Sequence, residues 1–384
     1  MTPPHRDLLG GARARDLRET VATAHVIVCT GSGGVGKTTT AASLAVGAAQ
    51  MGRRTIVLTI DPARRLAQAL GLRHLDSQPR AVAEVVGLDA MMLDMKRTFD
   101  EVIERHAEDA QAANRIKANR FYQQLSSSLA GTQEYMAMEK LYDLHSLGTY
   151  DCIVVDTPPT RSALDFLDAP KRLTDFLEGR FLKMFLNPPV RAGRTIGKAV
   201  GFGTGVFMRA ASRLTGSGVL HDLGEFFQQL EGMYDGFKQR AQSVYRLLGD
   251  PRSAFVVVAS PEPPSLREAR YFLRRLESDG MPLAGLVVNR VTLPAPSSLR
   301  RVTVPKVAQA TAKLDPDDVR DATVARLLAL HVDRVEVAKR ERHAVNAAMH
   351  AIDPQALVEV PRLGHEVSDL ASVMEIGAHL YPPD

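Results

Sequence analysis

Short apolar runs rich in β-branched residues alternate along the chain with longer stretches whose apolar residues recur every three or four positions. The short runs predict buried strands, and the longer stretches predict helices that pack against them. Strands are expected at 25–30, 54–60, 152–155, 254–259, 283–289 and 356–360, and helices at 37–52, 132–147, 265–278, 322–349 and 367–380. The alternation predicts the α/β fold class: a doubly wound, mostly parallel sheet with helices on both faces.

A different pattern interrupts these units in the middle of the chain. Residues 99–129 are helical by composition and heavily charged, and residues 221–248 place apolar side chains three or four apart, as in a long amphipathic helix. Between them lie two apolar runs, 176–190 and 199–208, with basic residues between the runs. We therefore expect a helical insertion subdomain, mainly within residues 97–250. Residues 293–318 are rich in proline and basic, which predicts a loop or linker.

The stretch Gly31–Thr38, GSGGVGKT, joins the first predicted strand to the first predicted helix. A strand, a G-x-x-x-x-G-K-T loop and a helix in this order form a phosphate-binding P-loop. Its glycines let consecutive N–H groups point at a phosphate, and the helix N-terminus adds partial positive charge. Lys37 supplies a full charge to the β and γ phosphates, and Thr38 supplies a hydroxyl ligand for Mg²⁺. The predicted binding residues are Gly33, Gly34, Val35, Gly36, Lys37, Thr38 and Thr39.

Asp61 follows the second predicted strand and precedes a proline. The carboxyl ends of strands are where open α/β sheets place their working residues. A carboxylate there, beside a phosphate-binding loop, can accept a proton or a hydrogen bond from an attacking water. Alone, Asp-Pro predicts only a turn, so the P-loop is what makes Asp61 a catalytic candidate.

Composition excludes several functions. The 48 basic and 44 acidic residues give a net charge of +4, which is too small to imply a nucleic-acid partner by itself. No uncharged apolar run approaches the roughly 18 to 20 residues of a membrane span, and the N-terminus lacks an apolar signal core. We therefore expect a cytoplasmic protein without a transmembrane segment. Cys29 and Cys152 lie within predicted strands, where cysteine acts as a small buried hydrophobe.

These motifs resemble the ArsA-type ATPases, and a bacterial paralogue among them. The family includes the ATPase of bacterial arsenite pumps and the ATPase that targets tail-anchored membrane proteins, within the wider set of deviant-Walker-A dimers. The resemblance rests on 31–39, on Asp61-Pro62-Ala63 and on 156–160. Further matches are 91–95, expected as a strand, 131–134 opening a helix, 286–290, 358–361 and 367–370. The helical segments between these motifs match much less.

The resemblance implies an ATPase that uses ATP and Mg²⁺ and acts as a dimer. It implies that Asp61 orients the hydrolytic water and that Asp156 holds Mg²⁺ through a water, with 157–160 as a switch segment. The implied catalytic residues are therefore Lys37, Asp61 and Asp156, and the implied metal site is Thr38, Asp61 and Asp156. Asn289 is similar to the asparagine that reads adenine, and Pro361 to the loop that covers the base. An asparagine offers the donor and the acceptor that the adenine edge needs, although alone it is a common turn residue.

The chain departs from the family at three points. The signature lysine at the second loop position, which reaches the partner's nucleotide, is Ser32 here. This predicts a heterodimer with a lysine-bearing ArsA-like paralogue, or a homodimer in which Arg64 or Arg65 compensates. The chain also has no C-x-x-C for a zinc clasp and no cluster of three thiols for arsenite.

The expected organisation is a leader over residues 1–23 and a nucleotide-binding domain in three parts, 24–96, 131–170 and 251–384. The helical subdomain takes 97–130 and 171–250. The first function hypothesis is an ArsA-like ATPase that couples hydrolysis to dimer opening and closing and acts on a partner or client other than arsenite. The alternatives are a client-binding factor that holds an apolar helix near Phe181 and Phe185, and a partition-type regulator of DNA or membrane.

Overall fold

The computed structural model describes residues 16–61, 65–120, 122–123, 132–158, 234–293, 304–349 and 356–382. Within these ranges the strands form one eight-stranded sheet in the order β3-β4-β2-β5-β1-β6-β7-β8. Every pair is parallel except β3–β4. The strands are β1 Val26–Gly31, β2 Thr55–Thr59, β3 Arg80–Ala81, β4 Leu88–Met92, β5 Cys152–Asp156, β6 Ser253–Ala259, β7 Leu283–Val291 and β8 Leu357–Pro361.

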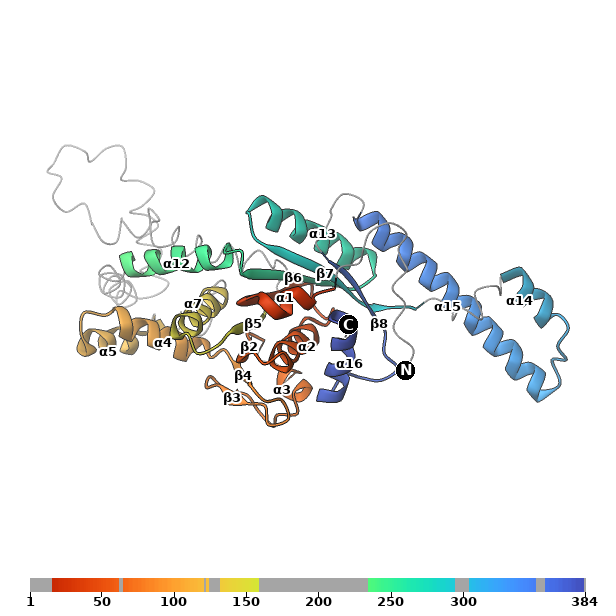
Figure 1. Ribbon diagram of the computed structural model, residues 1–384, viewed down its shortest axis with the longest axis horizontal. Coiled ribbons are helices and arrows are strands. Elements are labelled where there is room, and N and C mark those ends of the chain that lie inside the picture. The colour runs from red at the N-terminus through yellow and green to blue at the C-terminus, as the bar shows by residue number, and fades with distance from the viewer. Residues whose placement is uncertain are drawn as a thin grey trace, which may run out of the picture.

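Helices cover both faces of this sheet (Figure 1), because the strand residues alternate between two apolar clusters. In β1, Val26 and Val28 belong to one cluster, and Ile27 and Cys29 belong to the other. The first cluster packs under α4 Met95–His106, α7 Thr132–Leu147, α12 Tyr234–Leu248 and α13 Pro263–Ser278. The second packs under α1 Arg18–Thr23, α2 Lys37–Gln50, α3 Arg65–Ala69 and α16 Leu370–Leu380. The doubly wound α/β fold is therefore confirmed.

Two groups of helices extend beyond the sheet at opposite ends of the molecule (Figure 1). At one end α5 Ala110–Ala118 continues from α4, and at the other α14 Val304–Thr311 packs against the 31-residue helix α15 Val319–Met349. Within the described ranges, no helix combines the length and the apolar character needed to cross a membrane.

The helix that follows the P-loop is fixed by close packing against the C-terminal helix. Most of α2 is buried, and alanines on its surface let α16 and the sheet approach closely. The Tyr381 hydroxyl donates to the Ser43 carbonyl at 2.8 Å, and the Ser43 hydroxyl donates to the Val373 carbonyl at 2.8 Å. A Cβ at Gly47 would lie 2.5 Å from the Tyr381 ring, so glycine is required at this crossing. The start of α2, and Lys37 with it, is thereby held in place.

The structure shifts several of the predicted elements. The strand expected at 91–95 lies at Leu88–Met92, because Asp94 caps α4 by accepting a hydrogen bond from the Arg97 N–H at 2.9 Å. The helix expected from 99 is two helices, because Asp109 starts α5 in the same way. The final helix begins at Leu370 instead of 367, after the cap Asp369.

The linker expected at 293–318 contains α14, in which Pro305 occupies the first turn, where proline is tolerated. Residues 176–190, 199–208 and 221–233 of the predicted insertion lie outside the described residues, as do Arg64, Phe181 and Phe185.

Candidate functional site

A cavity of about 900 Å³ opens at the carboxyl ends of the parallel strands. The strand order reverses on either side of β1, and in such sheets this switch point is where ligands bind. The P-loop contributes one wall, and the ends of β2, β7 and β8 contribute the others. Residues lining the cavity include Gly34, Gly36, Lys37, Thr38, Thr39, Asp61, Arg65, Thr157, Glu262, Asn289, Arg290, Pro361, Arg362, Leu363 and His365.

The P-loop needs glycine at three positions. Gly31 has φ 150° at the end of β1, and a Cβ there would lie 2.0 Å from the Val258 carbonyl oxygen. Gly34 and Gly36 have φ 77° and 100°, in the left-handed region that a side chain rarely adopts. Gly36 is also the N-cap of α2, so the loop ends where the helix presents its unpaired N–H groups.

Lys37 is 6% exposed, and its ammonium lies against the P-loop itself. Its Nζ donates a hydrogen bond to the Ser32 carbonyl at 2.9 Å. Burial lowers the pKa of Lys37, and the neighbouring carboxylates Asp156 and Asp61 oppose this change. A buried cation facing two acids across a loop of amides is suited to hold a polyanion and a metal together.

Asp156 ends β5 and is fully buried, in register with Cys29 of β1. Its carboxylate accepts a hydrogen bond from the Thr59 hydroxyl at 2.9 Å. Burial raises the pKa of Asp156 to about 6, although the hydroxyls of Thr38 and Thr59 and the charge of Lys37 favour the ionised form. Its Oδ1 atom accepts no hydrogen bond within the described part of the chain. A buried carboxylate oxygen left without a donor is costly unless a ligand or ion satisfies it.

Asp61 is half-buried at the end of β2 and lines the cavity. Its backbone N–H donates to the Thr59 hydroxyl at 3.2 Å, and that hydroxyl in turn donates to Asp156. Thr59 therefore joins the two acidic residues, although its sequence context is that of an ordinary strand residue. Its place two residues before Asp61, at a strand end, is the signal that could have identified it.

Asn289 and Pro361 form the far end of the cavity, at the ends of β7 and β8. The Asn289 side chain is 9% exposed and its Nδ2 donates to the Val35 carbonyl of the P-loop at 2.8 Å. Sequence patterns do not identify this contact, because 254 residues separate its partners. Arg290 and Arg362, which follow the same two strand ends, also line the cavity without having been predicted.

Most of the predicted residues meet in this one cavity. Gly34, Gly36, Lys37, Thr38, Thr39, Asp61, Asn289 and Pro361 line it. Val35 and Asp156 are buried behind its wall, whereas Gly33 is exposed on the loop. The roles assigned to these residues in catalysis, nucleotide binding and metal binding stay predictions.

A P-loop between a parallel strand and a helix, with a lysine and two strand-end carboxylates around one cavity, defines the class of P-loop nucleoside triphosphatases. The family model described as anion-transporting ATPase matches residues 24–311 of the chain. The chain therefore belongs to the anion-transporting, or ArsA, ATPase family and is an ATPase.

Three similar proteins each match about 70% of this chain. The ATPase GET3 of Malassezia globosa is 28% identical over 279 residues, covering 71% of this chain and 74% of the relative. ATPase ASNA1 homolog 1 of Paramecium tetraurelia is 26% identical over 268 residues, covering 69% and 74%. An uncharacterized protein of Streptomyces coelicolor, SCO2128, is 30% identical over 266 residues, covering 69% of this chain and 62% of the relative.

Proposed function

We propose that the chain is a cytoplasmic, Mg²⁺-dependent ATPase that works as a dimer and uses hydrolysis to act on a protein client. The observation that carries the proposal is the buried Asp156 carboxylate, whose Oδ1 has no donor within the described residues, beside the P-loop lysine and threonine. Such an atom is expected where a bound ion completes the site.

The donor set around this atom fits Mg²⁺. Magnesium prefers oxygen ligands and keeps several waters, so one hydroxyl and one or two carboxylates suffice beside substrate phosphates. Thr38 and Asp156 would hold it, with Asp61 nearby on the cavity wall. When bound, the ion would neutralise charge on the β and γ phosphates.

Other residues of the chain bind the triphosphate, orient the attacking water and enclose the base in this proposal. The loop amides and the Lys37 ammonium would hold the triphosphate, since Gly34, Gly36, Lys37, Thr38 and Thr39 line the cavity. Asp61 accepts a hydrogen bond from the attacking water and so orients it toward the γ phosphate. Asn289 and the segment after Pro361 enclose the base.

Ser32, at the second position of the P-loop, makes a side-chain contact within the chain. The Ser32 hydroxyl lies 3.1 Å from the Ser265 hydroxyl of α13, which also accepts a hydrogen bond from the Ser260 N–H at 3.0 Å. Serine carries no charge, so a second cation must come from elsewhere. Arg65 lines the cavity, and its charge contributes to lowering the pKa of Lys37. Arg65 is therefore the described residue best placed to supply it in a homodimer, and a lysine-bearing paralogue would supply it in a heterodimer.

A client other than arsenite is favoured by the state of the thiols. Cys29 and Cys152 are fully buried in β1 and β5, and burial raises the pKa of Cys152 to about 11. Arsenite binds thiolates, which these residues do not present. The family resemblance to ATPases that target tail-anchored membrane proteins supports an apolar helix as the client.

Titration with Mg·ATP tests the central proposal. We expect saturable binding that Lys37→Ala abolishes, because the variant removes the buried cation that faces the phosphates. Lys96→Ala is the matched control, since Lys96 is exposed on α4 and pairs only with its neighbour Asp100 among the ion pairs of the described residues. Absence of ATP uptake by the parent chain, or unchanged binding by Lys37→Ala, would refute the proposal.

Turnover measurements address the dimer. We compare the chain alone, Arg65→Ala, and the chain mixed with a lysine-bearing paralogue. Loss of activity in Arg65→Ala supports compensation within the chain, whereas activation only by mixing supports the heterodimer. Full activity alone that is unaffected by replacing Arg64 and Arg65 rejects both.

Two further assays separate the alternatives. Detergent-free capture of hydrophobic helices that depends on Phe181 and Phe185 supports the client-binding function. Binding to DNA or anionic vesicles in low salt would instead support a partition-type regulator, since such contacts are electrostatic and weaken as salt rises.

A further inference from the structure

We infer that Asn289 is a positioning residue for phosphate binding: its side-chain amide holds the P-loop in the shape that presents an N–H group to the triphosphate. This inference rests on the proposed nucleotide-binding function and adds to it. It predicts that Asn289 affects binding of the triphosphate, which contains no base. A residue that only recognises adenine would not have this effect.

The contacts of the amide fix both of its ends. Nδ2 donates to the Val35 carbonyl at 2.8 Å, and Oδ1 accepts from the Arg290 N–H at 2.9 Å. A carbonyl can only accept and an N–H can only donate, so these partners determine which atom is nitrogen and which is oxygen. Asn289 is nearly buried, and water therefore competes little for either bond.

The Val35 carbonyl determines the direction of a phosphate-binding group. In a planar trans peptide the C=O and the following N–H point in opposite directions. A hydrogen bond that holds the Val35 carbonyl toward Asn289 therefore holds the Gly36 N–H away from it, on the loop side. Amides aligned in this way are what an anion-binding loop requires.

Gly36 explains why this peptide needs an external support. With φ 100° and no Cβ, Gly36 permits rotation of the Val35–Gly36 peptide that a larger residue would restrict. The space beside it is taken by Asn289, because a Cβ on Gly36 would lie 2.2 Å from Nδ2. The missing side chain of Gly36 thus leaves room for the Asn289 amide. That amide in turn holds the Val35–Gly36 peptide, whose rotation Gly36 does not restrict.

Backbone contacts at the ends of β7 and β8 hold Asn289 itself in place. Arg290 lies at an irregularity in the β7–β8 pairing and has φ 64°, the one positive φ of a non-glycine residue in the described ranges. Its N–H donates to Asn289 Oδ1 at 2.9 Å, next to this irregularity. The Arg362 N–H donates to the Val291 carbonyl at 3.0 Å, next to Pro361. The strand ends that enclose the base therefore also hold the residue that shapes the phosphate loop.

Inorganic tripolyphosphate is the decisive probe because it has no base. We compare the parent chain and Asn289→Ala for displacement of labelled ATP by tripolyphosphate and for direct binding of ATP. We expect the affinity of the variant for tripolyphosphate to fall roughly five- to tenfold, the factor that one neutral hydrogen bond provides. A tripolyphosphate affinity within twofold of the parent would overturn the inference while leaving ATP binding by the parent intact.

Two further variants keep the result unambiguous. Asn289→Ser retains a hydroxyl near the Arg290 N–H but is one bond too short to reach Val35. It should show the same loss of tripolyphosphate affinity, and it takes the place of Asn289→Ala in the test if that variant folds poorly. Thr292→Val removes a side-chain hydrogen bond to Glu341 just after the same strand, outside the cavity lining, and should leave tripolyphosphate affinity unchanged. An equal loss in Thr292→Val would show that any disturbance of this strand end weakens binding and would refute a specific role for Asn289. A parent chain that binds no ATP would refute the proposed function itself.

Discussion

Two fully buried carboxylates, Asp156 in the sheet and Glu139 in α7, have opposite surroundings. Both lose their hydration on folding, and burial raises the pKa of each. Glu139 has its charge and its hydrogen-bonding capacity satisfied within the chain. Asp156 keeps an oxygen without a donor in the described part of the chain.

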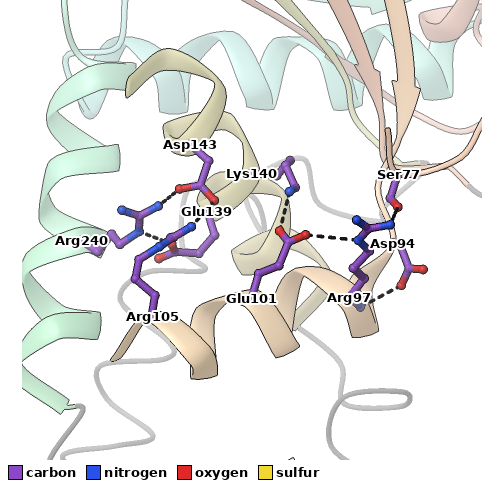
Figure 2. Close-up of polar contacts among 9 residues, drawn as sticks. All are labelled: Ser77, Asp94, Arg97, Glu101, Arg105, Glu139, Lys140, Asp143 and Arg240. Atoms are coloured by element: carbon purple, nitrogen blue, oxygen red, sulfur yellow. Dashed lines mark hydrogen bonds and ion pairs between the residues drawn. The ribbon is translucent and has the colours of Figure 1, made fainter. Parts of the chain in front are cut away.

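Glu139 belongs to a network that joins three helices (Figure 2). Its Oε1 accepts from the Tyr135 hydroxyl at 2.6 Å. Its Oε2 pairs with Arg240 of α12 (Figure 2). Arg240 also pairs with Asp143, which Arg105 of α4 contacts at 2.9 Å from outside. Each buried charge here has an opposite charge and a hydrogen bond, which is what burial of an ion requires.

We propose that this difference separates a structural acid, Glu139, from an acid that takes part in the reaction, Asp156. The buried ion pair between Glu139 and Arg240 joins α7 to α12, and both Glu139 oxygens already have a partner. At Asp156 the cation that favours the ionised form, Lys37, donates its hydrogen bond to the Ser32 carbonyl, and the Asp156 Oδ1 atom has no donor within the described residues. The cost of burying Glu139 is offset within the chain, whereas at Asp156 we propose that a bound ligand offsets it.

Replacing Asp156 should have the largest effect on activity. In Asp156→Asn we expect turnover to fall roughly 10²- to 10³-fold, because an oriented charge at the reacting phosphates is lost. Thermal stability should be unchanged or higher, since a buried charge is removed. Steady-state ATPase assays and calorimetric melting check the two parts, and a large loss of stability would show that Asp156 is a structural acid after all.

Replacing Glu139 should have the reverse result. Glu139→Ala leaves Arg240 with Asp143 alone in a largely buried position, and we expect a loss of about 2–4 kcal/mol in the free energy of unfolding. ATP affinity should remain close to that of the parent, since the residue lies in α7, away from the cavity lining. Urea unfolding and ATP titration measure both. Weakened ATP binding in a variant that is still folded would contradict the separation of the two regions.

The pH dependence of ATP turnover should follow the ionisation of Asp156. In the proposed mechanism Asp156 acts in its ionised form, so we expect turnover to fall about tenfold from about pH 7 to about pH 5, given a pKa of about 6. Raising Mg²⁺ should move this fall to lower pH, because metal and proton compete for the same oxygen.

The free energy of unfolding of the ligand-free chain should fall as pH rises through the range in which activity increases. The folded carboxyl keeps its proton above the pKa of the unfolded one, so this contribution to stability falls as pH rises from about 4 to about 6. Glu139 acts in the same direction, and Asp156→Asn isolates the part due to Asp156. A pH–stability curve identical in parent and variant would contradict the raised pKa.

The smallest effect is expected at the outer edge of the network. Arg105 is 38% exposed, and Asp143 retains Arg240 without it. Arg105→Gln should therefore cost about 0.5 kcal/mol or less in urea unfolding. It serves as the matched control for Glu139→Ala, and a loss as large as that of Glu139→Ala would mean that position in the network, and not burial, sets the energy.

The sequence determined the elements whose patterns are local. The P-loop, the strand-end acids Asp61 and Asp156 and the order of strands and helices follow from spacing over a few residues, because backbone hydrogen bonding and apolar periodicity act at that range. The boundaries that moved, at Asp94, Asp109 and Asp369, depend on side-chain caps that compete with the periodic pattern.

Only the tertiary structure decided which distant residues share the site. Asn289 reaches Val35, Arg240 reaches Glu139, and Thr59 bridges to Asp156 across separations of about a hundred residues or more. Such contacts depend on the strand order and on the packing of side chains between elements, and neither leaves a periodic trace in the chain. The residues that we propose bind phosphate can therefore be identified from the sequence, whereas those that hold them in position are identified only from the structure, in which the sheet brings its strand ends together.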